Sequence, residues 1–198
     1  MKILASSTLL FAYRFEDLIP LALALGYDGV EAWHFHQLKT HEDPSTLAKA
    51  AQTNGALLTT HALSWDLNFC SALKSVRETS LEALRSSIKF GRDTGSKVVV
   101  IHPGNTTIPG GTPERSWNYL VEGVTNLCDF ARTCEVEVSL EVMEHIPKEF
   151  FINPADAHHL LSMISPNNLS ITLDTAHAPL ELDLADYLRE TPRVGHIH

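Results

Sequence analysis

Seven short apolar runs, separated by longer helical patterns, constrain the fold of this 198-residue chain more than any other feature. Each run is continuously apolar instead of alternating with polar residues, which is typical of parallel strands covered on both faces. Strands that alternate with helices in this way predict an α/β fold with a parallel sheet. The runs span residues 2–6, 29–33, 56–61, 97–102, 136–142, 169–174 and 193–198.

Capping residues mark the ends of several predicted helices. Asp43 and Pro44 supply an N-cap and a proline at the first helical position, and Gly55 stands just beyond the end of that helical pattern. The same chemistry recurs at Thr112-Pro113 and at Asn153-Pro154. Helices are therefore expected to fill the intervals between the apolar runs.

Two parallel architectures agree with this alternation. A doubly wound sheet that binds a dinucleotide would carry a GxGxxG motif after its first strand, and the sequence has none there. Seven regularly spaced units instead predict a single (β/α)8 TIM-barrel domain over residues 1–198, truncated after the seventh strand. An open barrel would leave unpaired strand edges, so we expect a missing C-terminal unit of about 40–80 residues that contains a strand ending in glutamate.

Composition excludes several classes of protein. Apolar residues make up 44% of the chain and charged residues 20%, as in globular proteins, and no apolar stretch approaches the ~18–20 residues of a membrane span. The formal charge of −9, without a Lys/Arg cluster, disfavours a nucleic-acid partner. The three cysteines cannot all pair and show no CxxC spacing, so we expect a reduced, cytoplasmic chain. A homo-oligomer stays open.

Metal-ligating residues gather where the predicted strands end. Catalytic groups of a TIM barrel lie at the C-terminal ends of its strands, so side chains at these positions converge on one mouth. Four strand ends carry histidine, and the two between them carry glutamate and aspartate. This set predicts a site for a divalent ion such as Mn, Mg, Co or Zn. The expected ligands are His61, His102, Glu141, Asp174 and His198.

Each expected ligand has a simpler explanation that must be weighed. Glu141 could be an ordinary loop carboxylate, but it follows Val-Ser-Leu in an apolar run, and a buried carboxylate needs a partner. Asp174 could cap a following helix, although Pro179 and a weak helical pattern argue against this. Either of His61 and His102 alone could merely bond a neighbouring carbonyl, and their joint occurrence favours ligation.

The remaining polar residues near the mouth receive weaker assignments. We expect only one of His196 and His198 to face the barrel interior, and we favour His198 because it is nearer the mouth, with His196 packed outside. His177 is a candidate substrate donor, second-metal ligand or loop residue, in that order. Glu31 and Trp33 are candidate substrate-binding residues, although core and rim positions are the simpler interpretation. The histidines expected on the surface or in helices are His34, His36, His41, His145, His158 and His159.

These motifs together resemble the xylose-isomerase-like TIM-barrel superfamily. The resemblance rests on "TTHA" at His61, "IHPG" at His102, "LEVMEH", "LDTAH" and "VGHIH", and it spans nearly the whole chain. The superfamily contains sugar and sugar-phosphate isomerases and epimerases, together with the endonuclease IV group. The resemblance implies that Glu141, Asp174 and His198 hold a metal in the isomerase branch, with a fourth ligand, a glutamate, on the eighth strand.

The endonuclease branch of the same superfamily supplies a second set of implied roles. There, His61 and His102 match positions that bind zinc. His177 matches a zinc ligand in that branch and a substrate-contacting histidine in some epimerases. The resemblance therefore does not decide whether the site holds one metal ion or several.

Three functions follow from these branches. We expect a sugar or sugar-phosphate isomerase or epimerase of carbohydrate metabolism, in which Glu141 is both ligand and proton carrier through an enediolate. The alternatives are zinc-dependent cleavage of abasic DNA and a metal-binding barrel without catalysis. The negative charge disfavours DNA, and so does the run Glu-Val-Met-Glu-His from Glu141, where the endonuclease branch continues Glu-Asn-Thr-Ala-Gly.

Overall fold

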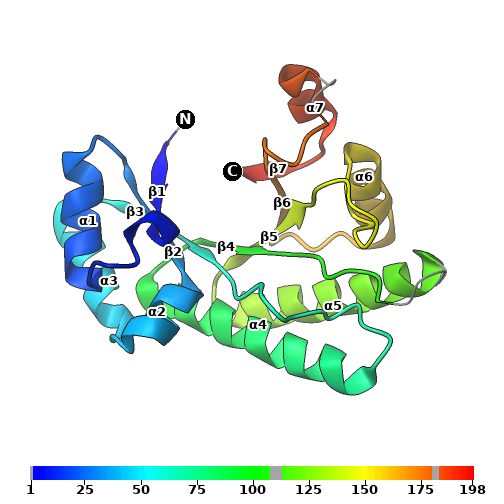
Figure 1. Ribbon diagram of the computed structural model, residues 1–198, viewed down its shortest axis with the longest axis horizontal. Coiled ribbons are helices and arrows are strands. Elements are labelled where there is room, and N and C mark those ends of the chain that lie inside the picture. The colour runs from blue at the N-terminus through cyan, green and yellow to red at the C-terminus, as the bar shows by residue number, and fades with distance from the viewer. Residues whose placement is uncertain (1, 108–112, 180–182) are drawn as a thin grey trace.

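The computed structural model describes residues 2–107, 113–179 and 183–198, and its seven strands form one parallel sheet in chain order, β1 to β7. Figure 1 shows the sheet curled, with the helices on its outer side. The predicted parallel α/β fold of the TIM-barrel type is thus confirmed. The strands are β1 (Leu4–Ser6), β2 (Gly29–Trp33), β3 (Leu57–His61), β4 (Val98–Ile101), β5 (Glu137–Val142), β6 (Leu169–Leu173) and β7 (Val194–Ile197).

Helices connect each strand to the next, as predicted. They are η1 (Ser7–Leu10), α1 (Phe15–Ala24), α2 (His34–Thr40), α3 (Pro44–Asn54), α4 (Lys74–Thr94), α5 (Pro113–Thr133), α6 (Pro154–Met163) and α7 (Leu184–Glu190). The Asp43 side chain accepts a hydrogen bond from the Ser45 amide at the start of α3, and Gly55 ends the helix in the left-handed region with φ 65°. Asn153 and Asp156 form a capping box on α6. The predicted cap at Thr112 lies outside the described residues.

Alternation along β5 shows how the fold places a carboxylate at the mouth. Val138, Leu140 and Val142 are buried in the large core cluster beneath the outer helices. Burying such side chains contributes roughly 1.5–3 kcal/mol each, so it fixes which face of the strand points outward. Successive side chains alternate across a strand, and Ser139 and Glu141 therefore point to the inner face.

Two further findings bear on the expectations from composition. All three cysteines are buried free thiols. In the described part of the chain, every helix is too short or too polar to cross a membrane.

Candidate functional site

The carboxylate of Glu141 lies at the centre of the histidine cluster on the inner side of the sheet. Glu141 is 2% exposed, and its Oε2 atom is buried without a hydrogen-bond partner among the described residues. This atom lies 3.4 Å from Nε2 of His102, 3.5 Å from Nδ1 of His198 and 3.7 Å from Nε2 of His61. An unpartnered buried carboxylate oxygen is costly, so this atom calls for a cation.

The outer hydrogen bonds of two histidines indicate which ring nitrogens face Glu141 with a lone pair. Nδ1 of His61 lies 2.8 Å from the Ala62 carbonyl oxygen, so Nδ1 carries the proton in the neutral ring and Nε2 does not. Nε2 of His198 lies 2.9 Å from Oε2 of Glu31, which likewise leaves Nδ1 unprotonated in the neutral ring. With both rings neutral, a carboxylate oxygen and two nitrogen lone pairs would converge with no hydrogen between them, an arrangement that needs a bound cation.

The pKa shifts of Glu141 and His198 also indicate that the cluster favours a bound positive charge. Burial would raise the pKa of the Glu141 carboxyl, but the facing imidazoles of His102, His198 and His61 outweigh burial and hold this pKa well below its ordinary value. Burial would lower the pKa of His198, yet Glu141 and Glu31 raise it to about 10. The cluster therefore holds a proton when no other cation is bound.

Among the described residues, three trios of side chains bring metal-ligating atoms together, and two of them share Glu141. In each trio the ligand atoms lie within 4.8 Å of one another. The donors are imidazole nitrogen and carboxylate oxygen, which suit Zn, Mn or Co. The residues present therefore fit a divalent ion, and the five expected ligands all lie in this cluster. The two trios that share Glu141 are His61, His102 and Glu141, and Glu141, Asp174 and His198; the third is Glu31, His196 and His198.

The carboxylate of Asp174 has two different roles for its two oxygens. Oδ1 accepts a 2.7 Å hydrogen bond from the Ala176 amide and closes a turn directly after β6. Oδ2 lies 3.6 Å from Nε2 of His177. The residue thus caps a turn instead of a helix, and its Oδ2 atom remains available as a ligand in the cluster.

His177 joins the cluster to a cavity. Its Nδ1 donates to the Val142 carbonyl oxygen at 2.9 Å, so Nε2 of the neutral ring is an acceptor. Nε2 lies 3.5 Å from Oε2 of Glu144. Both residues line a cavity of about 690 Å³, and Trp33, Trp65 and His102 line it too.

The indole of Trp33 forms one wall of this cavity and also holds a histidine. Its ring stacks on His61 with centroids 3.7 Å apart and planes 4° from parallel. Sequence analysis did not single out Trp65, Asn68 and Lys148, which also line the cavity. They follow the ends of β3 and β5, and that position was the available signal.

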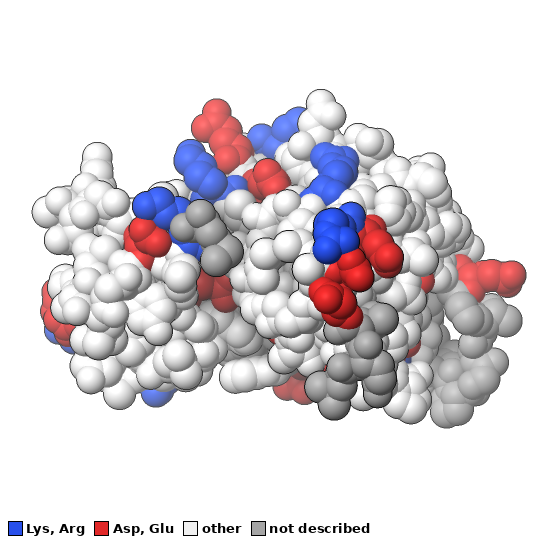
Figure 2. Space-filling view, turned by 90° about the horizontal axis from the view of Figure 1, so that it is seen from above, with Lys and Arg blue, Asp and Glu red and all other residues white. Residues whose placement is uncertain are grey.

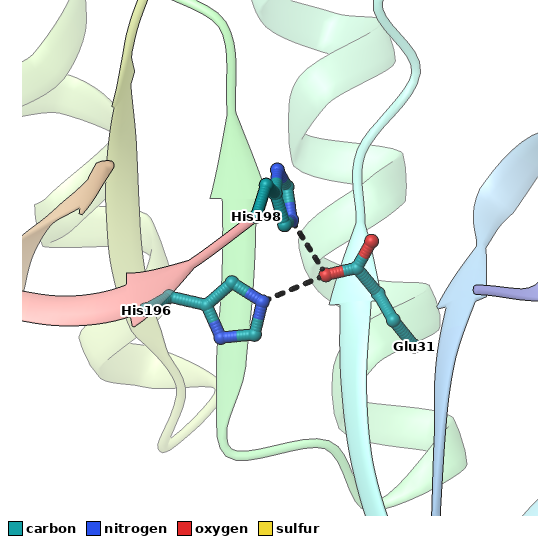
Figure 3. A group of neighbouring side chains, drawn as sticks. All are labelled: Glu31, His196 and His198. Carbon is teal, nitrogen blue, oxygen red and sulfur yellow. Dashed lines mark hydrogen bonds and ion pairs between the residues drawn. The ribbon is translucent and has the colours of Figure 1, made fainter. Parts of the chain in front are cut away.

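Glu31 lies outside the cavity lining and binds two histidines, His196 in β7 and His198 directly after it. Its Oε2 atom lies 2.9 Å from Nε2 of His196 and 2.9 Å from Nε2 of His198 (Figure 3). Burial would raise the pKa of the Glu31 carboxyl, but these two hydrogen bonds lower it below its ordinary range. The expectation that His196 packs outside is wrong, because residues two apart on a strand lie on the same face.

Two other histidines, expected on the surface or in a helix, lie in a helix and are buried. His34 and His36 both lie in α2 and are buried. Nδ1 of His34 lies 3.0 Å from the Ser87 hydroxyl, and Nε2 of His36 donates to the Tyr13 carbonyl at 2.9 Å. Each buried ring thus has a hydrogen-bond partner, which reduces the cost of burying it. The remaining four, His41, His145, His158 and His159, are exposed as expected.

Comparison with known proteins agrees with this architecture. Residues 19–198 match the family described as xylose isomerase-like TIM barrel. An uncharacterized protein of Methanocaldococcus jannaschii, MJ1614, is 26% identical over 148 residues, 75% of this chain and 57% of that protein. D-psicose 3-epimerase of Agrobacterium fabrum is 25% identical over 197 residues, 93% of this chain and 67% of the epimerase. The chain thus spans little more than half the length of the first relative.

Solved structures show the same fold. The structure of an L-ribulose 3-epimerase superposes with a TM-score of 0.84 at 20% identity, covering 100% of this chain and 69% of that one.

Proposed function

Because this chain belongs to the xylose isomerase-like TIM-barrel family, we propose that it is a divalent-metal-dependent sugar isomerase or epimerase. The observation that carries the proposal is the buried Oε2 of Glu141, which faces three imidazole nitrogens without a hydrogen-bond partner among the described residues. The match to a D-psicose 3-epimerase and the sugar-sized cavity beside the cluster support it.

Glu141, Asp174 and His198 would hold the ion, and His61 and His102 offer two more nitrogen donors. When bound, a divalent ion polarises a substrate carbonyl and acidifies the adjacent C–H bond. The two oxygens of Glu141 divide the remaining work. Oε2 faces the ligand histidines, whereas Oε1 lies 3.6 Å from Nδ1 of His177, a residue that lines the cavity, and from this position it would take and return the substrate proton.

Two cavity residues would position the sugar. Nε2 of His177 would accept a hydrogen bond from a substrate hydroxyl, because its Nδ1 proton is already given to Val142. The flat face of Trp33 would cover one side of the substrate and exclude water from the proton transfer. Trp33 ends β2 and His177 follows the end of β6, so the parallel sheet holds both groups at one edge.

Charge disfavours the alternative of abasic DNA cleavage. On the face drawn in Figure 2, Lys and Arg side chains lie beside Asp and Glu side chains and form no continuous basic surface. The charged groups of the cavity include Asp66, Glu144 and Glu149, with Lys148 placed 3.5 Å from Glu149. A phosphodiester backbone would meet mostly negative charge there.

The free cysteine thiols favour a reduced compartment such as the cytoplasm.

The test is a panel of ketoses and aldoses incubated with the full-length gene product. Protein stripped with a chelator and reloaded with Mn²⁺, Co²⁺, Mg²⁺ or Zn²⁺ should convert at least one sugar into its epimer or isomer, and the stripped protein should not. A duplex that contains an abasic site is incubated in parallel. Zinc-dependent nicking of that duplex, with every sugar unchanged, would overturn the proposal.

A further inference from the structure

We propose that Glu31 is a positioning residue that fixes the orientation of His198 for metal binding, an inference that rests on the proposed metal dependence of the site. Figure 3 shows the geometry: the rings of His196 and His198 both point at one carboxylate oxygen of Glu31. Both hydrogen bonds are 2.9 Å long.

The hydrogen bond to Glu31 selects which nitrogen of His198 is offered to the cluster. A neutral imidazole carries one proton, and a carboxylate can only accept, so the proton lies on Nε2 toward Glu31. Nδ1 then keeps its lone pair for a metal ion, and it is the atom that lies 3.5 Å from Oε2 of Glu141. Carboxylates that hold the far nitrogen of a ligating histidine fix its tautomer and raise its basicity.

Glu31 is itself held rigidly enough for this role. It is 5% exposed in the middle of β2, where it pairs with Thr59 of β3. His196 of β7 supplies a second N–H to the same oxygen, and His198 follows the end of this strand. The carboxylate is therefore tied from two sides, and it joins β2 to β7 although these strands are not neighbours in the sheet.

His196 has a secondary part in this arrangement. Its ring meets the His198 ring edge to face, with centroids 5.0 Å apart, and its nearest carboxylate is Glu31. Removal of His196 leaves the bond between Glu31 and His198 in place. Removal of Glu31 breaks both bonds and frees the His198 ring to turn.

Cobalt titration of the full-length protein tests the proposal without any sugar. Co²⁺ alone is added to chelator-stripped protein, and its visible absorption reports both affinity and coordination. Glu31→Ala should weaken Co²⁺ binding about 10–100-fold and alter the absorption bands, as loss of an outer hydrogen-bond partner does at metal sites. Glu31→Gln keeps one acceptor oxygen, so its Co²⁺ affinity should fall less. The Co²⁺ affinity of His196→Ala should fall least.

A matched carboxylate separates positioning from general destabilisation. Glu42 is also shielded, and it binds Arg14 and the Phe15 amide at the start of α1. Glu42→Gln should lower the melting temperature and leave Co²⁺ affinity unchanged. In the Zn²⁺-loaded protein, ¹⁵N NMR of the His198 ring should find the proton on Nε2 in wild type and a mixed or reversed pattern in Glu31→Gln.

The outcomes discriminate between this inference and the proposed function. Wild-type Co²⁺ affinity and an unchanged His198 tautomer in the Glu31 variants would overturn the positioning role, while sugar conversion would still stand. Weakened binding without any sugar conversion would support the positioning role and refute the isomerase. If Glu31→Ala does not fold, the isosteric Glu31→Gln decides by the same two measurements, and a wild type that binds no Co²⁺ overturns both claims.

Discussion

Replacing His34 by phenylalanine should make the protein more resistant to mild acid. His34 is 6% exposed in α2, and burial lowers its pKa from the ordinary 6.5 to about 4. The unfolded chain therefore binds a proton near pH 6.5 that the folded chain refuses until about pH 4. His34 contributes its full stability above pH 6.5, and this contribution falls as the pH drops toward 4.

The size of the effect follows from the two pKa values. Their difference corresponds to about 3 kcal/mol in the free energy of unfolding, and about 2 kcal/mol of this is lost by pH 5. Phenylalanine keeps the ring that stacks on Phe90 with centroids 4.8 Å apart. Ser87 keeps the Leu63 amide and the Ala83 carbonyl as hydrogen-bond partners, so no buried hydroxyl is stranded.

Urea unfolding followed by circular dichroism at pH 7.5 and pH 5 measures the loss. From pH 7.5 to pH 5, the free energy of unfolding of wild type should fall by about 2 kcal/mol more than that of His34→Phe. His145 is exposed, so His145→Gln should behave as wild type does. An equal loss in wild type and His34→Phe would refute the argument from burial.

Substitutions at three other residues test individual parts of the site. Asp174→Ala should sharply lower the metal content measured by elemental analysis, and an unchanged content would remove Asp174 from the ligand set. His177→Ala should raise KM or lower kcat while metal content is retained, and loss of metal would make it a ligand instead. Trp33→Ala should lower the free energy of unfolding by about 2 kcal/mol or more, because it uncovers His61. Trp33→Phe should lower it by less than about 1 kcal/mol, because the buried Nε1 of Trp33 has no hydrogen-bond partner among the described residues. Equal denaturation midpoints for both Trp33 variants would contradict the stacking argument.

The sequence was sufficient for features that depend on local chemistry and chain order. Continuous apolar runs predicted parallel strands, and the caps at Asp43 and Asn153 lie where the helices begin. The convergence of Glu141 with His61 and His102 follows from strand order alone, because parallel strands present their C-terminal ends at one edge of the sheet.

Features that depend on contacts between distant strands were not predicted. The acceptor of His196 is Glu31, 165 positions away on β2, and no local pattern reveals this pairing. The face of His196 was a different matter, since the two-residue period of a strand already places it with His198. His34 is buried because α4 supplies Ser87 and Phe90 around it, and this packing is decided by tertiary structure.

The most direct test of the central claim is solvent deuterium exchange at the carbon next to the substrate carbonyl. Wild-type protein, loaded with Mn²⁺ in D₂O, should place deuterium at this carbon of its sugar. Glu141→Gln keeps the shape and one ligand oxygen but removes the base, so exchange should fall by about 10²–10⁴-fold at saturating metal. Glu122→Gln, an exposed change on α5, should exchange as wild type does. Exchange at the wild-type rate in metal-loaded Glu141→Gln would contradict the account.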